Sequence, residues 1–455
     1  NGENYQIGFT PANQVIDLRD FGPGKTLVLV NGKRMADYPF PYNGNSASFN
    51  WGSIPLAAVS LAVSILIIPM VFAIGVAYGL TPLIAGADGK EDPAEAVKYF
   101  KNGLILNSIL GLLVYGVLAL FAQFAHLLGQ DARVVEASLP YIHLVGLSIV
   151  PMMSFFAFKQ FAEGLSDTKA GMRVSLVANL LNILLNYPLI TGWGPFPELG
   201  LAGAAIATLS TRFLMLAGMA LYIRKHQKFA SYWSHWRDSQ ISWKSIRDIL
   251  VIGVPSGLQY VFEAGAFAMS GVIVGMIGPV QQAAHQIALN IASVSYMMVS
   301  GLGAAATIRV GNQLGKKDFP MLRLAGQSLF HLTLAMMVLT MGLLIALRNI
   351  VPEFYSSDPE VLQYTAVLMI AAGIFQLPDG LQATTLGALR GVQDVNIPTI
   401  IAFIAYWVVA VPLCYYLGVV MAIGPLGVWI GLAIGLLLAA IALYWRFQYK
   451  VRSLH

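Results

Sequence analysis

Charged residues are scarce in this chain of 455 residues. Asp, Glu, Lys and Arg make up 11% of it, whereas a soluble globular protein has about 25%. Long stretches contain none of the four, among them residues 38–87, 264–308 and 395–445. Mean hydropathy is +0.68, and a helix that spans a bilayer needs about 20 consecutive apolar residues. The composition excludes a soluble enzyme and predicts an all-α, polytopic membrane protein.

Cysteine and catalytic motifs are also missing. Cys414 is the single cysteine, which excludes an intrachain disulfide and a cluster of thiolate metal ligands. The sequence has no Walker A pattern, no nucleophile elbow and no His-Glu-x-x-His motif. We therefore expect neither enzyme activity nor a cofactor. The net charge of +5 does not predict nucleic-acid binding, because the basic residues lie in short loops between apolar runs.

The chain repeats itself at a spacing of 226 to 227 residues. Gly89-Lys90-Glu91-Asp92 recurs as Gly315-Lys316-Lys317-Asp318, and Gly164-Leu165-Ser166-Asp167 recurs as Gly391-Val392-Gln393-Asp394. Further pairs are Ala57–Ala62 with Ala283–Ala288, and Leu199–Leu201 with Leu426–Val428. Such internal similarity predicts two homologous helical bundles.

Apolar runs and their Gly, Pro and charged boundaries predict five membrane helices in the first half and six in the second. We expect an N-terminal lobe over 54–225, a cytoplasmic linker over 226–243 and a C-terminal lobe over 244–455. The expected helices are 54–86, 96–126, 134–163, 168–191, 199–223, 244–276, 279–313, 319–348, 358–389, 395–419 and 424–446.

The first half lacks a counterpart for the first helix of the second half. At the repeat spacing this counterpart would be residues 18–50, which carry several charges and many Gly, Pro and Asn residues. Such a segment cannot span a bilayer as a helix. We expect residues 1–53 to be a loosely ordered polar fragment.

Basic residues predict the orientation. Of 27 Lys and Arg residues, 20 fall in one alternating set of loops and ends, namely 90–101, 159–173, 224–247, 309–323, 390 and 446–452. The positive-inside rule assigns this set to the cytoplasm, together with the C-terminus.

Two acids lie within apolar helices of the second half. Glu263 stands in the first of these helices, and Asp379 follows Pro378 in the fourth. Ionisable groups inside a membrane are costly and mark functional sites by default. The pair could share a proton or an alkali cation, and an interhelical hydrogen-bonding role is the alternative.

Three polar or aromatic side chains are further candidates. Asn182 and Asn186 share one face of their helix, where they could contact a cation or a drug amine, or hydrogen bond between helices. Tyr296 could line a cavity for flat cations, although aromatic residues at helical spacing also serve plain packing.

From about Leu56 to Leu454 the chain resembles the multidrug and toxic compound extrusion (MATE) family, and its NorM-type branch in particular. The motifs that carry the resemblance are Leu56-Ala57-Ala58-Val59-Ser60, Glu163-Gly164-Leu165-Ser166-Asp167, Asn182 to Asn186, Pro197-Glu198-Leu199-Gly200, Ala283-Ala284-His285-Gln286-Ile287-Ala288-Leu289-Asn290, Ile308-Arg309-Val310-Gly311 and Gly387-Ala388-Leu389-Arg390-Gly391.

This resemblance implies export of lipophilic organic cations in exchange for Na⁺ or H⁺, by a monomer in the plasma (inner) membrane. It assigns the coupling cation to Glu263 and Asp379, which are also the expected metal ligands where that cation is Na⁺. Asn182, Asn186 and Tyr296 match substrate or cation positions, and Phe375 stands where the family often has Tyr.

The family has twelve helices, so the resemblance also implies that the first one is missing here. Residues 16–59 instead resemble a fragment of the plug of TonB-dependent receptors, with Leu27–Val30 as a strand. A fusion with a MATE-like body that does not transport, and a flippase of lipid-linked sugars, are therefore alternative hypotheses.

Overall fold

The computed structural model describes residues 29–30, 33–34, 49–128 and 132–454, with side chains from residue 57 onward. Most of the predicted fragment 1–53 lies outside these residues. A two-stranded antiparallel pair is present, in which Leu29 faces Arg34 and Val30 faces Lys33. Its strands are β1 (Leu29–Val30) and β2 (Lys33–Arg34).

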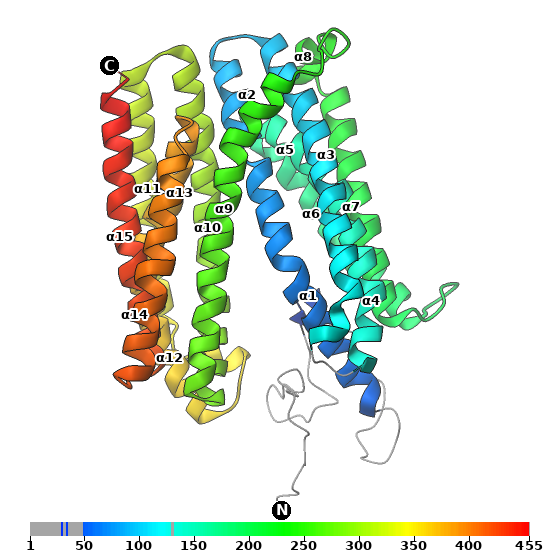
Figure 1. Cartoon of the computed structure of the whole chain (residues 1–455), viewed down its shortest axis with the longest axis vertical. Coiled ribbons are helices and arrows are strands. Elements are labelled where there is room, and N and C mark those ends of the chain that lie inside the picture. The colour runs from blue at the N-terminus through cyan, green and yellow to red at the C-terminus, as the bar shows by residue number, and fades with distance from the viewer. Residues whose placement is uncertain (1–28, 31–32, 35–48, 129–131, 455) are drawn as a thin grey trace, which may run out of the picture. The chain divides into compact units, whose positions relative to one another are not determined.

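The rest of the described chain is helical (Figure 1). The first half contains α1 (Phe49–Ala77), α2 (Leu80–Gly89), α3 (Pro93–Gln123), α4 (Ala132–Leu147), α5 (Ile149–Gly164), α6 (Thr168–Thr191) and α7 (Gly200–Lys225), with a 3₁₀ turn at Ala125–Leu128. The predicted linker contains a 3₁₀ turn, Gln227–Phe229, and the short helix α8 (Ala230–Ser234).

The second half contains α9 (Trp243–Ile277), α10 (Pro279–Lys316), α11 (Phe319–Ala346), α12 (Pro359–Gly391), α13 (Asn396–Phe403), α14 (Val411–Tyr415) and α15 (Pro425–Arg452), with a 3₁₀ turn at Val351–Phe354. Two π-helical segments, Ile404–Ala410 and Tyr416–Val420, flank α14. Pro412 lies in α14, where its ring and missing N–H disturb the regular i to i−4 ladder.

Eleven helical spans of the described residues are long and apolar enough to cross a membrane. This agrees with the predicted five plus six. α1 and α2 together form the first span, α4 and α5 the third, and α13 to α14 with the π-helical segments the tenth. The described chain is therefore an all-α bundle of the polytopic membrane type.

The repeat seen in the sequence recurs in the backbone. α3 and α11 begin at Pro93 and Phe319, which are 226 residues apart. Two residues that adopt a left-handed conformation without being glycine, Glu91 (φ 57°) and Ser166 (φ 62°), have counterparts at the repeat spacing in Lys317 (φ 57°) and Gln393 (φ 59°). Because such conformations are rare outside glycine, their recurrence supports a common origin of the two halves.

The described helices group into two compact units that do not coincide with the predicted lobes. Of the described residues, the first unit comprises those up to Met70, those of 107–155 and those of 172–220, and the second comprises Val71–Leu106, Phe156–Gly171 and the described residues from Leu221 onward. One end of several first-half helices thus belongs to the same unit as the whole second half. The lobes 54–225 and 244–455 stay a prediction.

Polar contacts inside the second unit attach the linker helix α8. The Tyr232 hydroxyl donates to Asp88 Oδ1 at 3.1 Å, and Asn312 Nδ2 donates to the other oxygen of the same carboxylate at 2.8 Å. Burial, together with the negative charge of Asp88, raises the pKa of Tyr232 to about 12. The linker is therefore fixed to α2 and α10 by hydrogen bonds to one shared carboxylate.

α12 packs against α10, α11 and α15 in the second unit. The backbones of α10 and α12 approach so closely that a Cβ atom on Gly387 would lie 2.1 Å from the carbonyl oxygen of Gly303. Small residues commonly permit such approaches between membrane helices. Thr307 Oγ1 donates to the Gly387 carbonyl at 2.9 Å, which adds a polar contact at the same crossing.

We predict that Gly387→Ala lowers the thermal stability of the purified protein by several degrees, because forcing an atom into a packed crossing costs about 1–3 kcal/mol. Gly342→Ala is the matched control, since nothing lies within 4 Å of the added methyl group. Thermal unfolding in detergent measures both. Equal melting temperatures for the two variants would show that the α10–α12 crossing is not tightly packed.

Candidate functional site

A small cavity of about 50 Å³ lies within the second unit, formed by residues of α2, α5, α9, α10 and α12 and by Tyr78. Its size suits a few water molecules or a small cation. Its wall is unusually polar for an apolar bundle. The lining residues are Tyr78, Thr81, Gln160, Glu163, Gln259, Tyr260, Glu263, Tyr296, Ser300, Gly303, Ala304, Thr307, Ala383, Leu386 and Arg390.

Glu263, one of the two predicted acids, is part of this wall. It projects from α9, and its carboxylate lies near the hydroxyl of Tyr296 on α10. One turn before Glu263 on α9, Gln259 Nε2 donates to Thr399 Oγ1 at 2.9 Å. Thr399 in turn donates to the Pro255 carbonyl at 3.1 Å. The proline inside α9 is therefore supported by a polar contact with α13.

Asp379, the other predicted acid, is buried on α12 with 4% of its surface exposed. It is close enough to Glu263 for the two charges to interact, and the hydroxyls of Tyr296 and Tyr406 lie within electrostatic range of both. Within the described part of the chain, its Oδ1 atom has no hydrogen-bond partner. A buried carboxylate oxygen without a partner is costly, so this atom is available to a proton or a cation.

Tyr406 is positioned by Gln382, whose Nε2 donates to the tyrosine hydroxyl at 2.7 Å. Both side chains are almost fully buried. Two tyrosine hydroxyls, one from α10 and one from the π-helical segment after α13, thus lie near the pair of acids. Carboxylate and hydroxyl oxygens are suitable partners for a proton and for a hard cation.

Arg390, near the C-terminus of α12, supplies positive charge to the cavity. Its guanidinium carbon lies 5.6 Å from the ring centroid of Tyr78 and 5.7 Å from that of Tyr260. The two rings are stacked at 5.8 Å, and Arg390 Nε donates to Ser256 Oγ at 3.2 Å. The arginine therefore joins α12 to α9 and to the turn between α1 and α2 through cation–π contacts.

The α5 side of the cavity carries a third acid. Glu163 is buried and lies 3.5 Å from Lys159 Nζ, one helical turn earlier. Gln160, on the same helix, accepts a hydrogen bond from the hydroxyl of Thr81 on α2. Since Lys159 offsets the charge of Glu163, the acid of the described cavity without a salt bridge is Glu263, which Arg390 reaches only over a longer electrostatic range.

The other predicted site residues lie elsewhere. Phe375, one turn before Asp379, is buried among aromatic rings, 5.9 Å from Phe267 and 5.4 Å from Trp429 between centroids. It belongs to the apolar core of the second half and does not line the cavity. Its role as a substrate or cation contact stays a prediction.

Asn182 and Asn186 belong to the first unit and form a polar network of their own. Asn186 Nδ2 donates to Asn182 Oδ1 at 3.1 Å, and Asn182 Nδ2 donates to Thr211 Oγ1 on α7 at 3.2 Å. Asn186 Oδ1 is buried, and in the described chain it has no partner. The shared helical face that the spacing predicts is therefore present, together with one free acceptor.

No site role is predicted from the sequence for Arg390, Tyr78 or Tyr260. Arg390 stands at the end of an apolar helix, where a basic residue is typical of membrane topology. Only 6% of the surface of Arg390 is exposed, and the positions of charges in the sequence do not show that this side chain is buried.

The described residues contain no group of three or more His, Cys, Asp or Glu side chains that could hold a metal ion.

A double-mutant cycle tests the cation–π contact of Arg390. We predict that Arg390→Gln and Tyr260→Leu are coupled by about 1–2 kcal/mol, because a partly desolvated cation over an aromatic ring is stabilised by that amount. Equilibrium unfolding of the purified protein in mixed micelles measures the coupling. Tyr260→Phe is the control, since it keeps the ring and should keep most of the coupling. Additive effects of Arg390→Gln and Tyr260→Leu would contradict the contact.

Comparisons with known proteins agree with this architecture. The family model MatE matches residues 45–188 and 255–416. A probable multidrug resistance protein NorM from Xylella fastidiosa (strain Temecula1) is 31% identical over 396 residues, covering 87% of this chain and 84% of the relative. The multidrug resistance protein NorM of Vibrio parahaemolyticus is 30% identical over 402 residues, covering 88% of each chain.

Solved structures show the same fold. An outward-facing multidrug resistance MATE family transporter of the MOP superfamily has a TM-score of 0.80 at 22% identity, covering 88% of both chains. A eukaryotic MATE transporter has a TM-score of 0.78 at 21% identity, covering 89% of this chain and 91% of the other.

The predicted resemblance of residues 16–59 to a receptor plug is not borne out. The MatE match already begins at residue 45, and α1 begins at Phe49. The last part of the predicted plug segment therefore belongs to the first helix of the described chain. With a family match over both halves and relatives at 30% identity or more along most of its length, the chain belongs to the MatE family of multi-pass membrane transporters, which are not enzymes.

Proposed function

We propose that this chain exports lipophilic organic cations in antiport with Na⁺ or H⁺ by alternating access. The observation that carries the proposal is the pair of acids in the second unit, in which Glu263 lines the cavity and Asp379 is buried on α12 within electrostatic range of it. The names of the NorM relatives, which describe multidrug resistance proteins, support the substrate class.

The coupling follows from electrostatics in a medium of low dielectric constant. Two carboxylates at short range repel each other strongly unless a proton or a cation is bound between or on them. A bound coupling ion neutralises the pair and favours one arrangement of the helices. A cationic drug favours the arrangement in which the ion has left, and the two ligands then drive each other's exchange.

The bends next to the acids offer places where the helices can change arrangement. Pro378 precedes Asp379 inside α12, and Pro255 lies two turns before Glu263 inside α9. Proline inside a helix removes a backbone hydrogen bond and permits bending. A change in charge at either acid can therefore act on a helix that is already interrupted beside it.

We further propose that the protein works as a monomer in the plasma (inner) membrane with its C-terminus in the cytoplasm. The distribution of Lys and Arg supports this orientation. Export then moves the drug from the side of the basic loops to the opposite side, and the coupling ion moves inward.

Ethidium efflux in everted membrane vesicles tests the role of Glu263. We predict that Glu263→Gln reduces cation-driven flux to the background of vesicles without the protein, because the amide cannot bind and release a coupling ion. Glu353→Gln is the matched control, since this exposed glutamate lies in the 3₁₀ turn before α12. Full flux with Glu263→Gln, at equal protein in the membrane, would contradict the proposal.

Imposing one ion gradient at a time identifies the coupling ion. We predict that either a Na⁺ gradient or a pH gradient drives ethidium flux in proteoliposomes, and that Asp379→Asn removes the response to that gradient. Folding of the variant is checked by its elution as a monodisperse species. If neither gradient drives flux through the folded native chain, antiport is refuted and a chain that does not transport becomes the better account.

A further inference from the structure

A second concave site lies on the second unit, away from the acids. It is a groove of about 460 Å³ between the beginning of α11 and the end of α15. Arg323 and Gln327 form its wall on α11, and Gln448 and Arg452 form its wall on α15. Three aromatic residues complete it, namely Tyr444, Trp445 and Tyr449. No acidic side chain lines this groove in the described chain.

The two arginines of the groove are not neutralised by a neighbour. Among the described residues neither Arg323 nor Arg452 takes part in a salt bridge, and both are exposed. Arg446 on α15 provides the contrast, because its Nε lies 2.6 Å from Asp394 Oδ2. The fold thus pairs one arginine of this helix end with an acid and leaves two others, from two helices, facing the same groove.

Aromatic contacts join α11 and α15 beside the groove. Phe447 of α15 packs against Phe330 of α11 with ring centroids 5.4 Å apart. Gly326 makes this contact possible, since a Cβ atom there would lie 2.6 Å from the Phe447 ring. Tyr444 also contacts Phe330, at 5.5 Å. The two helices that carry the arginines are therefore joined by aromatic contacts.

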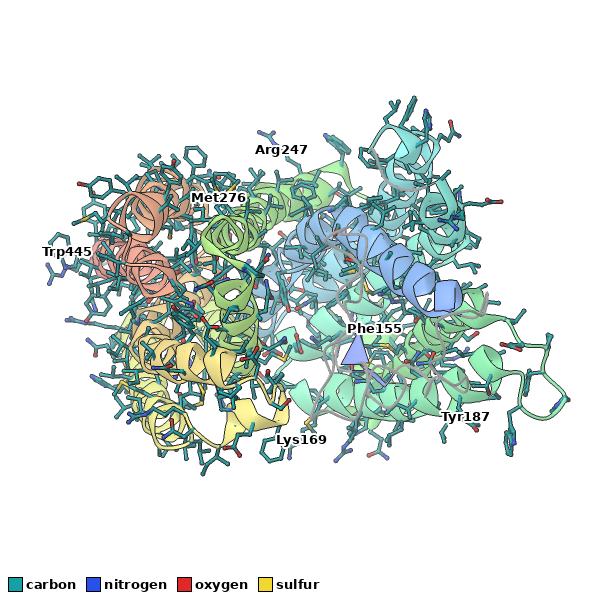
Figure 2. All side chains as sticks on the ribbon, turned by 90° about the horizontal axis from the view of Figure 1, so that it is seen from below. Phe155, Lys169, Tyr187, Arg247, Met276 and Trp445 are labelled. Carbon is teal, nitrogen blue, oxygen red and sulfur yellow. The ribbon has the colours of Figure 1, made fainter. Side chains whose placement is uncertain are left out.

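Aromatic side chains give the groove an apolar edge. Trp445 is 72% exposed and Tyr449 is 66% exposed, and Figure 2 shows Trp445 at the outer rim of α15, pointing away from the other helices. Trp and Tyr at the ends of membrane helices prefer the level of the lipid headgroups. The groove therefore combines an interfacial aromatic edge with two free positive charges and two amides.

We propose that this groove binds the phosphate group of an anionic phospholipid, such as phosphatidylglycerol, in the leaflet at this end of the helices. Arg323 and Arg452 bind the phosphate oxygens, because guanidinium groups match phosphate geometry. Gln327 and Gln448 donate to the glycerol headgroup, and Trp445 packs on the upper part of the acyl chains. A lipid is favoured over a free phosphate compound because the exposed aromatic edge suits acyl chains and not water.

Native mass spectrometry of the purified full chain tests this site. The protein is incubated with phosphatidylglycerol or with phosphatidylethanolamine, and the bound lipids are counted. We expect one tightly retained phosphatidylglycerol, and about 30-fold weaker retention in the double variant Arg323→Gln/Arg452→Gln, since each basic residue near an anionic surface contributes about a fivefold factor. Retention of phosphatidylethanolamine should be weak in both proteins.

The matched control is Lys244→Gln/Lys316→Gln. It removes the same charge from exposed positions at the beginning of α9 and the end of α10, outside the groove, and should keep the phosphatidylglycerol. Equal loss in both double variants would show a diffuse charge effect and overturn the site. Undiminished retention in the groove variant would also overturn it. Competition by soluble glycerol phosphate at the lipid's own concentration would assign the groove to a free phosphate compound instead.

Discussion

The repulsion between two carboxylates enclosed in an apolar bundle is the constraint on which the rest of the structure depends. A single acid inside a membrane is costly, and a pair in electrostatic range costs more unless something neutralises it. In the described chain, the carboxylate of Glu263 lies near the Tyr296 hydroxyl, whereas Asp379 keeps one oxygen without a partner. The pair therefore has one oxygen open to a proton or a cation, which the coupling site that we propose requires.

Tight helix packing keeps the acids enclosed. α10 and α12 approach at Gly303 and Gly387, and this crossing brings Tyr296 and Asp379, on the same two helices, into one neighbourhood. Arg390 continues the contact toward the end of α12, where it holds Tyr78 and Tyr260. The cavity thus has the carboxylate of Glu263 near Tyr296 and the guanidinium of Arg390 near the end of α12. The two groups lie within electrostatic range, so a change in the charge of one affects the other.

The lengths of the apolar runs predicted the number and the approximate bounds of the membrane-spanning helices. The predicted helix 168–191 coincides with α6, and the other predicted spans differ from the observed ones by a few residues at their ends, because runs without charge are bounded by Gly, Pro and charged residues. The i, i+4 spacing of Asn182 and Asn186 predicted their shared face, and the two amides are hydrogen bonded to each other.

Contacts between distant segments could not be predicted in the same way. The packing of Phe375 against Trp429, which lies far along the chain, could not be read from its place in the sequence. Arg390 has the sequence position of a topological charge, and its contacts with Tyr78 and Tyr260 depend on packing between helices that the sequence does not show. The grouping of helix ends into units likewise depends on tertiary packing, which neither hydropathy nor the repeat encodes.

The central claim is that the coupling ion and the drug compete through Glu263 and Asp379, and drug binding at equilibrium tests it most directly. Calorimetric titration of tetraphenylphosphonium into the purified protein is carried out with and without a saturating concentration of the coupling ion. The account predicts that the ion raises the apparent Kd of the native protein, and that this dependence disappears in the double variant Glu263→Gln/Asp379→Asn. An equal rise in Kd in the double variant would contradict it.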